Sequence, residues 1–197
     1  FGTWLKEHFN VRLADLKDLV DELFVSGVNH VLYHGTAYSP AEAPWPGWLF
    51  YASTQMNPRN AIWHDVRALN DYIARCQSVL QAGGPDNDIL VYWPIHDMWH
   101  DAKGREHNLT VHHTEWLTEQ PIGRIARQLR EQGHTFDYIS DRQLKQCKAD
   151  DSGITTPGSI YKVLLIPVCE YIPHDTLEAI IGLAESGATI LWQDHLP

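Results

Sequence analysis

Residues 27–63 read GVNHVLYHGTAYSPAEAPWPGWLFYASTQMNPRNAIW, and they hold the most informative pattern of this 197-residue chain. A short apolar strand is predicted at residues 30–33, and a long loop rich in Trp, Tyr, His and Asn follows it. Connections of this length without regular structure are uncommon in compact domains, and those that persist usually have a function. Aromatic side chains are costly to expose to water unless they pack or bind a ligand. We interpret the loop as facing a sugar, which offers C–H faces to aromatic rings and hydroxyls to amides and imidazoles; an ordinary surface loop is the alternative.

Two amphipathic helices flank this stretch. Apolar residues recur at helical spacing over residues 10–26 and again over residues 62–82, and a glycine ends each pattern. The order helix, strand, loop, helix predicts an α/β fold in which residues 1–84 are the terminal segment of a (β/α)8, or TIM, barrel. Active sites of such barrels lie at the carboxyl ends of the strands, where His34 and the loop would project.

A second domain is predicted over residues 86–197, after a boundary at the Gly-Gly-Pro sequence of residues 83–85. The predicted strands cover residues 88–94, 136–139, 162–168 and 188–192, and the predicted helices cover residues 115–132 and 174–186. The first strand is almost continuously apolar, as in strands that are buried on both faces. Strands that alternate with helices indicate a parallel sheet with right-handed crossovers. We therefore predict a flavodoxin-like domain, with polar segments at residues 96–113 and 141–159.

Composition excludes several classes of partner. The formal net charge of −10 disfavours binding to a phosphate backbone, so nucleic acid is not expected as a partner. Apolar runs stay short of the roughly 18 residues that a membrane span needs.

Three cysteines, at positions 76, 147 and 169, are an odd number without CxxC spacing, which indicates neither a disulfide framework nor a zinc site. The chain begins with Phe1, and we interpret it as a piece of a longer polypeptide.

Several ordered motifs resemble one enzyme family. They are G-x-N-x-x-x-x-H-G at residues 27–35, Pro-Gly at 46–47, N-x-x-N-x-x-W at 57–63, DYIARCQ at 71–77 and L-Q-x-G at 80–83. Over about residues 15–100 this frame is similar to the back half of the catalytic region of glycoside hydrolase family 106, the α-L-rhamnosidases. The resemblance implies hydrolysis of terminal α-L-rhamnosides with inversion, aided by calcium in the full-length enzyme. It also favours a periplasmic or secreted enzyme over a cytoplasmic one, although the residues themselves leave the compartment open.

Glycoside hydrolysis normally needs two carboxyl groups across the scissile bond. The glutamates of this chain fall mostly in helical patterns typical of solvated faces, and the catalytic residues of the chain stay unknown. The family resemblance implies that the acid and the base lie upstream of Phe1. The fragment would then be inactive alone, and no cofactor is expected within it.

A second resemblance concerns residues 162–191. KVLLIP at 162–167 and the pattern from Leu177 to Leu191 are similar to the glutamine-amidotransferase-like accessory domain that follows the barrel in family 42 β-galactosidases. In that family the domain supports oligomer contacts, so the resemblance implies a homo-oligomer. A nucleophilic role for Cys169 is disfavoured because the residues around it lack the glycines of a nucleophile elbow.

The candidate substrate-binding residues come from the loop and its family frame. They are His34, Tyr38, Trp45, Trp48, Asn57, Asn60 and Trp63. For His34 the alternative is a structural histidine, for Asn60 a helix cap, and for the two loop tryptophans a role in pinning the loop. No metal site is predicted, because His96 and His100 lack a convincing third ligand. The competing function is a non-catalytic carbohydrate-binding or oligomerisation module that kept the aromatic loop.

Overall fold

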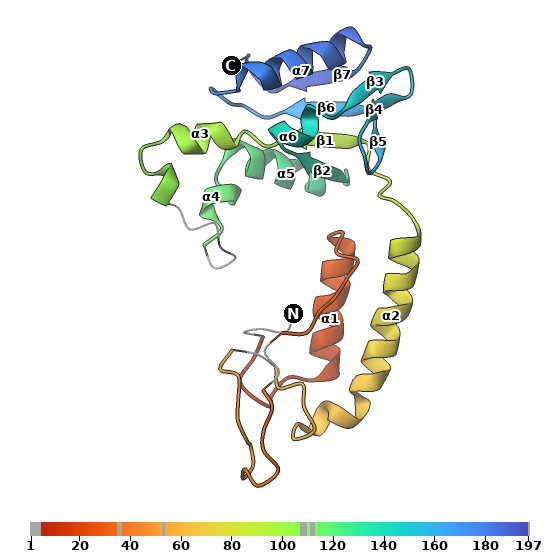
Figure 1. Cartoon of the computed structure of the whole chain (residues 1–197), viewed down its shortest axis with the longest axis vertical. Coiled ribbons are helices and arrows are strands. Elements are labelled where there is room, and N and C mark those ends of the chain that lie inside the picture. The colour runs from red at the N-terminus through yellow and green to blue at the C-terminus, as the bar shows by residue number, and fades with distance from the viewer. Residues whose placement is uncertain (1–4, 35–36, 53, 107–109, 111–112, 197) are drawn as a thin grey trace. The chain divides into compact units, whose positions relative to one another are not determined.

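The computed structural model describes residues 5–34, 37–52, 54–106, 110 and 113–196. The chain divides into two compact units, Phe1–Gly84 and Pro85–Pro197, which run from red to yellow and from green to blue in Figure 1. Each unit has its own hydrophobic core and is described by itself. Within the described residues, no helix combines the length and the apolar character that crossing a bilayer requires.

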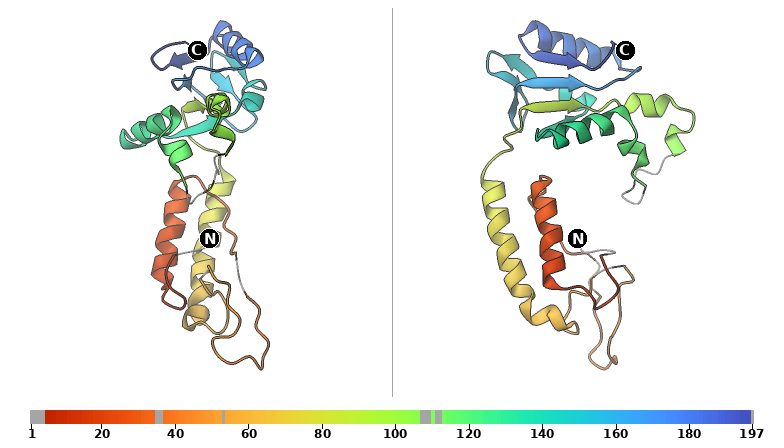
Figure 2. Two further views of the ribbon diagram at one scale, coloured as in Figure 1. Left: turned by 90° about the vertical axis from the view of Figure 1, so that its left-hand side faces the viewer. Right: turned by 180° about the vertical axis from the view of Figure 1, so that it is seen from behind.

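The first unit is built on two helices that lie side by side (Figures 1 and 2). Helix α1 spans Leu13–Val25, the 3-10 helix η1 spans Ala61–Asp65, and α2 spans Val66–Ala82. Apolar residues three or four positions apart lie on one side of their helix, and in each helix this side faces the other helix. The buried core consists of Val11, Leu16, Val20, Met56, Val66, Leu69 and Ile73. These helices confirm the helical periodicity of the sequence at both places.

The strand predicted at residues 30–33 is absent from the described part of this unit, and that prediction was wrong. A strand needs a neighbouring strand for its backbone hydrogen bonds, and side chains of α2 supply partners here instead. The Val31 N–H donates to Gln77 Oε1 at 2.5 Å, and Gln81 Nε2 donates to the carbonyl of Asn29 at 2.5 Å. The two glutamines of the family frame therefore hold this segment against the helix.

The second unit contains a four-stranded parallel sheet. Its strands are β1 (Ile89–Tyr92), β2 (Phe136–Ile139), β6 (Val163–Ile166) and β7 (Thr189–Trp192), in the order β2-β1-β6-β7. The α/β class and the parallel sheet are thereby confirmed. The register places Ile89 opposite Phe136 on one side and opposite Val163 on the other.

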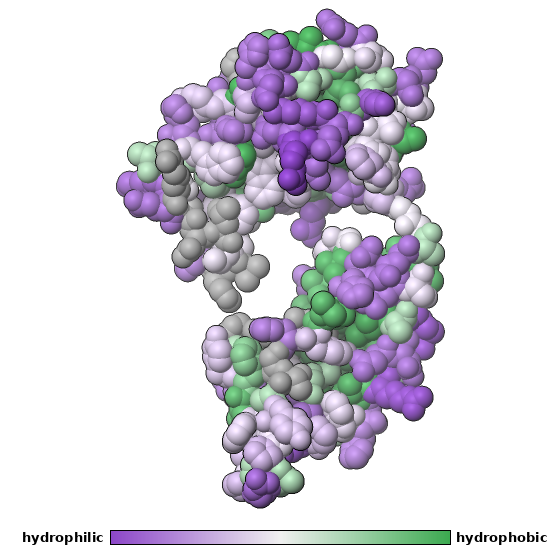
Figure 3. Space-filling view, viewed as in Figure 1, coloured by the Kyte–Doolittle hydropathy of each residue, from purple (hydrophilic) through white to green (hydrophobic). Residues whose placement is uncertain are grey.

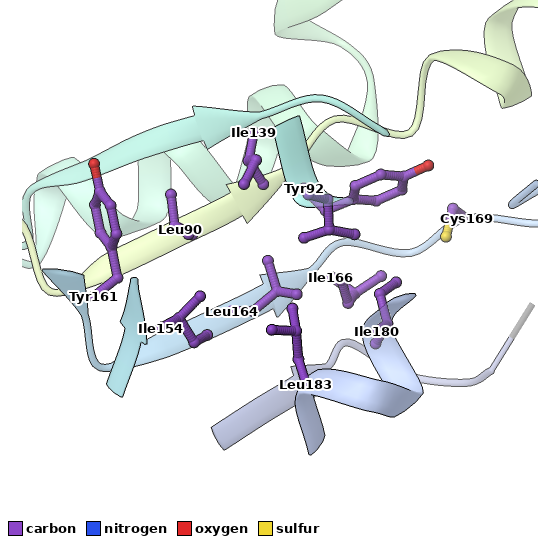
Figure 4. Close-up of a cluster of buried hydrophobic side chains, with 11 residues drawn as sticks. Leu90, Tyr92, Ile139, Ile154, Tyr161, Leu164, Ile166, Cys169, Ile180 and Leu183 are labelled. Carbon is purple, nitrogen blue, oxygen red and sulfur yellow. The ribbon is translucent and has the colours of Figure 1, made fainter. Parts of the chain in front are cut away.

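Helices cover both faces of this sheet. Helix α7 (His174–Glu185) packs with Leu90 and Leu164 on one face through Ile180 and Leu183 (Figure 4). Helix α5 (Pro121–Glu131) packs its apolar side on Val91, on the other face. Successive strand residues point to opposite faces, which explains why the strands read as continuous apolar runs.

The predicted helix at residues 115–132 is two helices, α4 (Glu115–Thr118) and α5. The break falls where Pro121 opens α5, because proline suits the first turn of a helix and cannot continue one. Short elements that the sequence did not indicate lie in or directly beside the polar segments. These are α3 (Ile95–His100), η2 (Gly104–Glu106), α6 (Asp141–Leu144), β3 (Lys148–Asp150), β4 (Gly153–Thr155) and β5 (Ile160–Tyr161).

Strands β3, β4 and β5 form a separate antiparallel sheet. Gly153 has φ +124°, and a Cβ there would lie 2.4 Å from the carbonyl oxygen of Tyr161, so only glycine fits. Ile154 is fully buried and joins the core of the parallel sheet (Figure 4). Ile154 of β4 and Tyr161 of β5, which is 5% exposed, thus tie the small sheet to the large one.

Candidate functional site

The aromatic loop of the first unit is fastened by Arg59. Its guanidinium donates from Nη1 to the carbonyl of Ala43 at 2.7 Å and from Nη2 to the carbonyl of Pro40 at 2.9 Å. The carbonyl of Arg59 accepts in turn from Trp45 Nε1 at 3.3 Å. Hydrogen bonds from a charged donor are stronger than neutral ones. Residues 40–45 are therefore held to the segment that precedes η1.

The Pro-Gly motif at residues 46–47 has a local steric cause. Gly47 has φ +82°, and a Cβ added to it would lie 2.5 Å from Ser39 Oγ. The same hydroxyl accepts a hydrogen bond from the Trp48 N–H at 2.9 Å. Glycine at 47 thus lets the chain turn closely past Ser39 and aim Trp48 outward.

The loop presents its aromatic side chains to solvent. The exposed fractions are 87% for Tyr38, 68% for Trp45, 62% for Trp48 and 38% for Trp63. The Trp45 ring contacts Phe9, with 5.2 Å between ring centroids. This part of unit 1 is largely pale in the space-filling view, as expected for Trp and Tyr of intermediate hydropathy (Figure 3). The indoles of Trp45 and Trp48 therefore lie outside the core, and the indole of Trp45 is also held by Phe9 and by the Arg59 carbonyl.

His34 is exposed and lies against Phe50. Their rings meet edge to face, with 5.3 Å between centroids and 74° between planes. The carbonyl of Phe50 accepts from Gln55 Nε2 at 2.9 Å, and Gln55 is completely buried. The contact therefore joins His34 to a fixed point of the core. Gly35, the last residue of the first motif, lies outside the described residues.

Asn57 and Asn60 are buried, with exposed fractions of 8% and 3%. Asn57 Oδ1 accepts from the Arg59 N–H at 3.0 Å. Asn60 Oδ1 accepts from the Ile62 N–H at 3.3 Å, as the N-cap of η1, and its Nδ2 donates to the carbonyl of Gln55 at 3.0 Å. Of the two interpretations of Asn60, the geometry favours the cap. Both amides shape the turn that carries Arg59.

Arg59 is the residue of this site that the sequence reasoning missed. A signal was present, because Arg59 stands between two motif asparagines, in a loop whose one acidic residue is Glu42. A guanidinium without carboxylates near it in sequence tends to find backbone carbonyls, since it carries five donors.

The carboxyl groups of the first unit with displaced pKa values are held ionised. The hydrogen bond from Arg12, together with one from Lys6, keeps the pKa of Asp15 well below its usual range. Lys17 lowers the pKa of Asp21, which also accepts from the Tyr72 hydroxyl at 2.5 Å. A general acid for glycoside hydrolysis needs a raised pKa, so neither group suits that role.

Cys169, His96 and His100 of the second unit have structural roles. Cys169 is 2% exposed, and burial, followed by the charge of Asp97, raises the pKa of its thiol to about 12. The thiolate is the nucleophilic form, so this cysteine is inert near neutral pH. His96 Nε2 lies 3.2 Å from Asp141 Oδ2, and His100 stacks on Tyr171 with 3.8 Å between centroids. The described residues contain no group of three or more His, Cys, Asp or Glu arranged to hold a metal ion.

Comparison with known proteins places the chain in a family. A protein from Formosa agariphila with the name "Putative beta-glucuronidase" is 27% identical over 180 residues. The match covers 90% of this chain and 14% of that relative, so the chain spans about one seventh of the relative's length. A family model described as alpha-L-rhamnosidase, glycoside hydrolase family 106, matches residues 3–194. Because this match covers nearly the whole chain, the protein belongs to glycoside hydrolase family 106.

Proposed function

We propose that this chain is a segment of an α-L-rhamnosidase that hydrolyses terminal α-L-rhamnosides, and that its aromatic loop lines the sugar-binding pocket of the full-length enzyme. The observation that supports the proposal best is the combination of two exposed indoles, Trp45 and Trp48, with a loop backbone fixed by Arg59. Exposed aromatic residues on an ordered loop are expensive without a ligand.

The chemistry of rhamnose suits such a loop. A deoxysugar has an apolar face with a methyl group, which an indole can cover, and hydroxyls that an imidazole can bind as donor or acceptor. A preordered loop loses little conformational entropy when the sugar binds. In this proposal Trp45, Trp48, Tyr38 and Trp63 supply the aromatic surface, and His34 supplies a polar contact. Asn57 and Asn60 act by shaping the loop.

Catalysis requires residues beyond those assigned here. The reaction needs one carboxyl group as acid and another as base, and we place both in polypeptide outside this chain. Calcium belongs to the full-length enzyme in this proposal, and a periplasmic or secreted location is part of it. The chain alone is expected to bind sugar weakly and to hydrolyse none.

The finer architecture is also a proposal. We assign the first unit to the end of a (β/α)8 barrel. Neighbouring strands of that barrel would form hydrogen bonds with the backbone of residues 30–33. We assign the second unit to the flavodoxin-like class, as an amidotransferase-like accessory domain with a role in homo-oligomer contacts. In support, the sheet order is β2-β1-β6-β7. When only the four parallel strands are numbered, this is the order 2-1-3-4, and flavodoxin-like sheets have the order 2-1-3-4-5.

A second candidate substrate class follows from the name of the Formosa agariphila relative. A β-glucuronide carries a carboxylate, which a binding site normally meets with Arg or Lys. Arg59 is the one Lys or Arg in the sequence of residues 27–63, and its guanidinium donates to two carbonyls. A neutral deoxysugar therefore fits the loop better than an anionic sugar.

The test is an assay of the full-length protein against aryl glycosides, including an aryl α-L-rhamnoside and an aryl β-D-glucuronide. We expect turnover of the rhamnoside. Turnover of the glucuronide alone would replace rhamnose as the substrate. Binding of rhamnose without turnover of any glycoside would favour the competing function, a non-catalytic carbohydrate-binding module, and neither binding nor turnover would refute the carbohydrate assignment.

A further inference from the structure

The second unit has a pocket of its own at the carboxyl ends of β1 and β6. The chain leaves β1 towards β2 through α5 on one face, and it leaves β6 towards β7 through α7 on the other. In open α/β sheets, ligands bind in the crevice where the connections diverge in this way. An open depression of the surface, with a volume of about 500 Å³, lies at this place. Its lining, here called the carboxyl-edge pocket, consists of His96, Trp99, His100, Tyr171, Ile172 and Pro173.

The two walls of the carboxyl-edge pocket are fixed to each other. One wall is α3, which follows β1, and the other is the segment that follows β6. The carboxylate of Asp97 on α3 accepts hydrogen bonds from the N–H of Tyr171 at 2.8 Å and from the N–H of Glu170 at 3.1 Å. A carboxylate that receives two backbone donors makes strong, charge-assisted bonds. The pocket is thus preformed, which lowers the cost of binding a ligand.

His96 has a defined orientation in this pocket. Asp141 Oδ1 accepts from the hydroxyls of Tyr92 at 2.8 Å and Thr176 at 2.9 Å, while Oδ2 lies 3.2 Å from His96 Nε2. In the tautomer that carries its hydrogen on Nε2, His96 gives the Asp141 carboxyl group a third donor. In the neutral imidazole Nδ1 is then an acceptor. A hydroxyl group of a ligand is the natural donor for it.

The remaining lining consists of the aromatic rings of Trp99, His100 and Tyr171 beside the aliphatic Ile172 and Pro173. Trp99 is 52% exposed and Tyr171 is 39% exposed, and the ring of His100 stacks on Tyr171. The lining contains neither Lys nor Arg, and the carboxylates of Asp97 and Asp141 stand behind it. This charge distribution disfavours phosphate and other anions. Flat aromatic faces beside an acceptor suit a neutral ring that bears both C–H groups and hydroxyls.

We propose that the carboxyl-edge pocket binds a neutral sugar ring, with Trp99 and Tyr171 as stacking surfaces and His96 Nδ1 as the acceptor for one hydroxyl. This is a carbohydrate site separate from the aromatic loop of the first unit. Binding at the carboxyl-edge pocket requires neither hydrolysis nor the aromatic loop. An experiment can therefore refute this proposal and leave the proposed function standing, or the reverse.

The experiment uses the 197-residue chain and records the indole N–H signals of its tryptophans by NMR during titration with L-rhamnose. Each signal is assigned from the corresponding Trp→Ala variant. We expect a saturable shift of the Trp99 signal. His96→Ala should raise the dissociation constant about 2- to 10-fold, the equivalent of one lost hydrogen bond. Tyr171→Ala, which removes the second stacking surface and keeps the Trp99 reporter, should also raise the dissociation constant that is read from the Trp99 signal.

Two variants serve as controls. Leu191→Ala removes another exposed apolar side chain of the same unit, outside the pocket, and should leave the Trp99 titration unchanged. Trp48→Ala removes an exposed indole of the loop and should also leave it unchanged. A Trp99 signal that stays fixed at saturating L-rhamnose overturns the inference, whatever the loop tryptophans do. A response of Trp45 and Trp48 alone would refute this pocket and support the proposed function of the loop.

Discussion

Arg59 donates a hydrogen bond from Nη1 to the backbone carbonyl of Ala43 at 2.7 Å, across 16 residues of sequence. With the second bond to Pro40, it converts an aromatic loop into an ordered surface. The order of the loop therefore depends on a side chain that need not touch a ligand. Arg59 fixes the loop and Trp48 is exposed on it, whereas Trp45 does both, because its Nε1 donates to the Arg59 carbonyl.

Replacing Arg59 should weaken substrate binding more than it slows the chemical step. In the full-length enzyme we expect Arg59→Ala to raise KM for an aryl rhamnoside by about tenfold or more, because two charge-assisted hydrogen bonds are lost. Arg59→Lys keeps the charge and can reach one carbonyl. Its KM should therefore lie between that of the wild type and that of Arg59→Ala. In limited proteolysis of the 197-residue chain, Arg59→Ala should be cleaved within residues 40–48 faster than the wild type. Unchanged KM together with unchanged proteolysis would contradict this role.

His34→Ala should lower turnover by the full-length enzyme more than about tenfold, since an imidazole contact to the reacting sugar would be lost. Its melting temperature should stay the same because His34 is exposed and contacts Phe50 at one edge. Phe50→Leu is the matched variant, because it removes the aromatic partner and keeps the imidazole. Wild-type kinetics in His34→Ala would remove this residue from the site.

Cys169 should resist alkylation in the folded chain. Its thiol is buried, its pKa is raised to about 12, and iodoacetamide reacts with the thiolate. Mass spectrometry after treatment at pH 8 should show modification at Cys76 before Cys147, whose pKa is also raised by burial, and none at Cys169. In urea all three should react. A raised pKa in the folded state means that this thiol contributes stability below the ordinary cysteine pKa, and the contribution is lost as pH rises through about 12.

Asp15→Asn should destabilise the first unit at neutral pH and have little effect in strong acid. The hydrogen bonds from Arg12 and Lys6 lower the pKa of Asp15 in the folded state. A lowered pKa contributes stability above the unfolded-state pKa near 4, and that stability is lost as pH falls through the folded-state value. Thermal unfolding of both proteins between neutral pH and strong acid should show melting temperatures that converge at the acid end. A difference that stays constant with pH would rule out this ion pair as the cause.

Much of the fold was predictable because it depends on local periodicity. The helical spacing around Leu16 and around Leu69 is long and regular, and the apolar run around Val91 has the length of a buried strand. The predictions of secondary structure fail where the structure depends on contacts with other segments. Residues 30–33 have strand composition without a neighbouring strand in the described unit, whereas β3 to β5 are too short to show a period.

The candidate site was predictable in outline and less so in detail. Composition identified the exposed indoles, because clustered tryptophans in a polar loop carry a signal of their own. The roles of Asn60 and Arg59 depend on hydrogen bonds to carbonyls several residues away. The residue type alone does not predict such a bond. Buried and exposed asparagines look alike in a sequence.

The attachment of Val31 to Gln77 has an energetic consequence. Two amide side chains substitute for part of a ladder of main-chain bonds, at a net worth of about 0.5–1.5 kcal/mol each. An incoming strand that paired with residues 29–33 would displace them and return several main-chain bonds in exchange. Such pairing would exchange side-chain bonds for main-chain bonds and leave the core residues Val66, Leu69 and Ile73 of α2 in place.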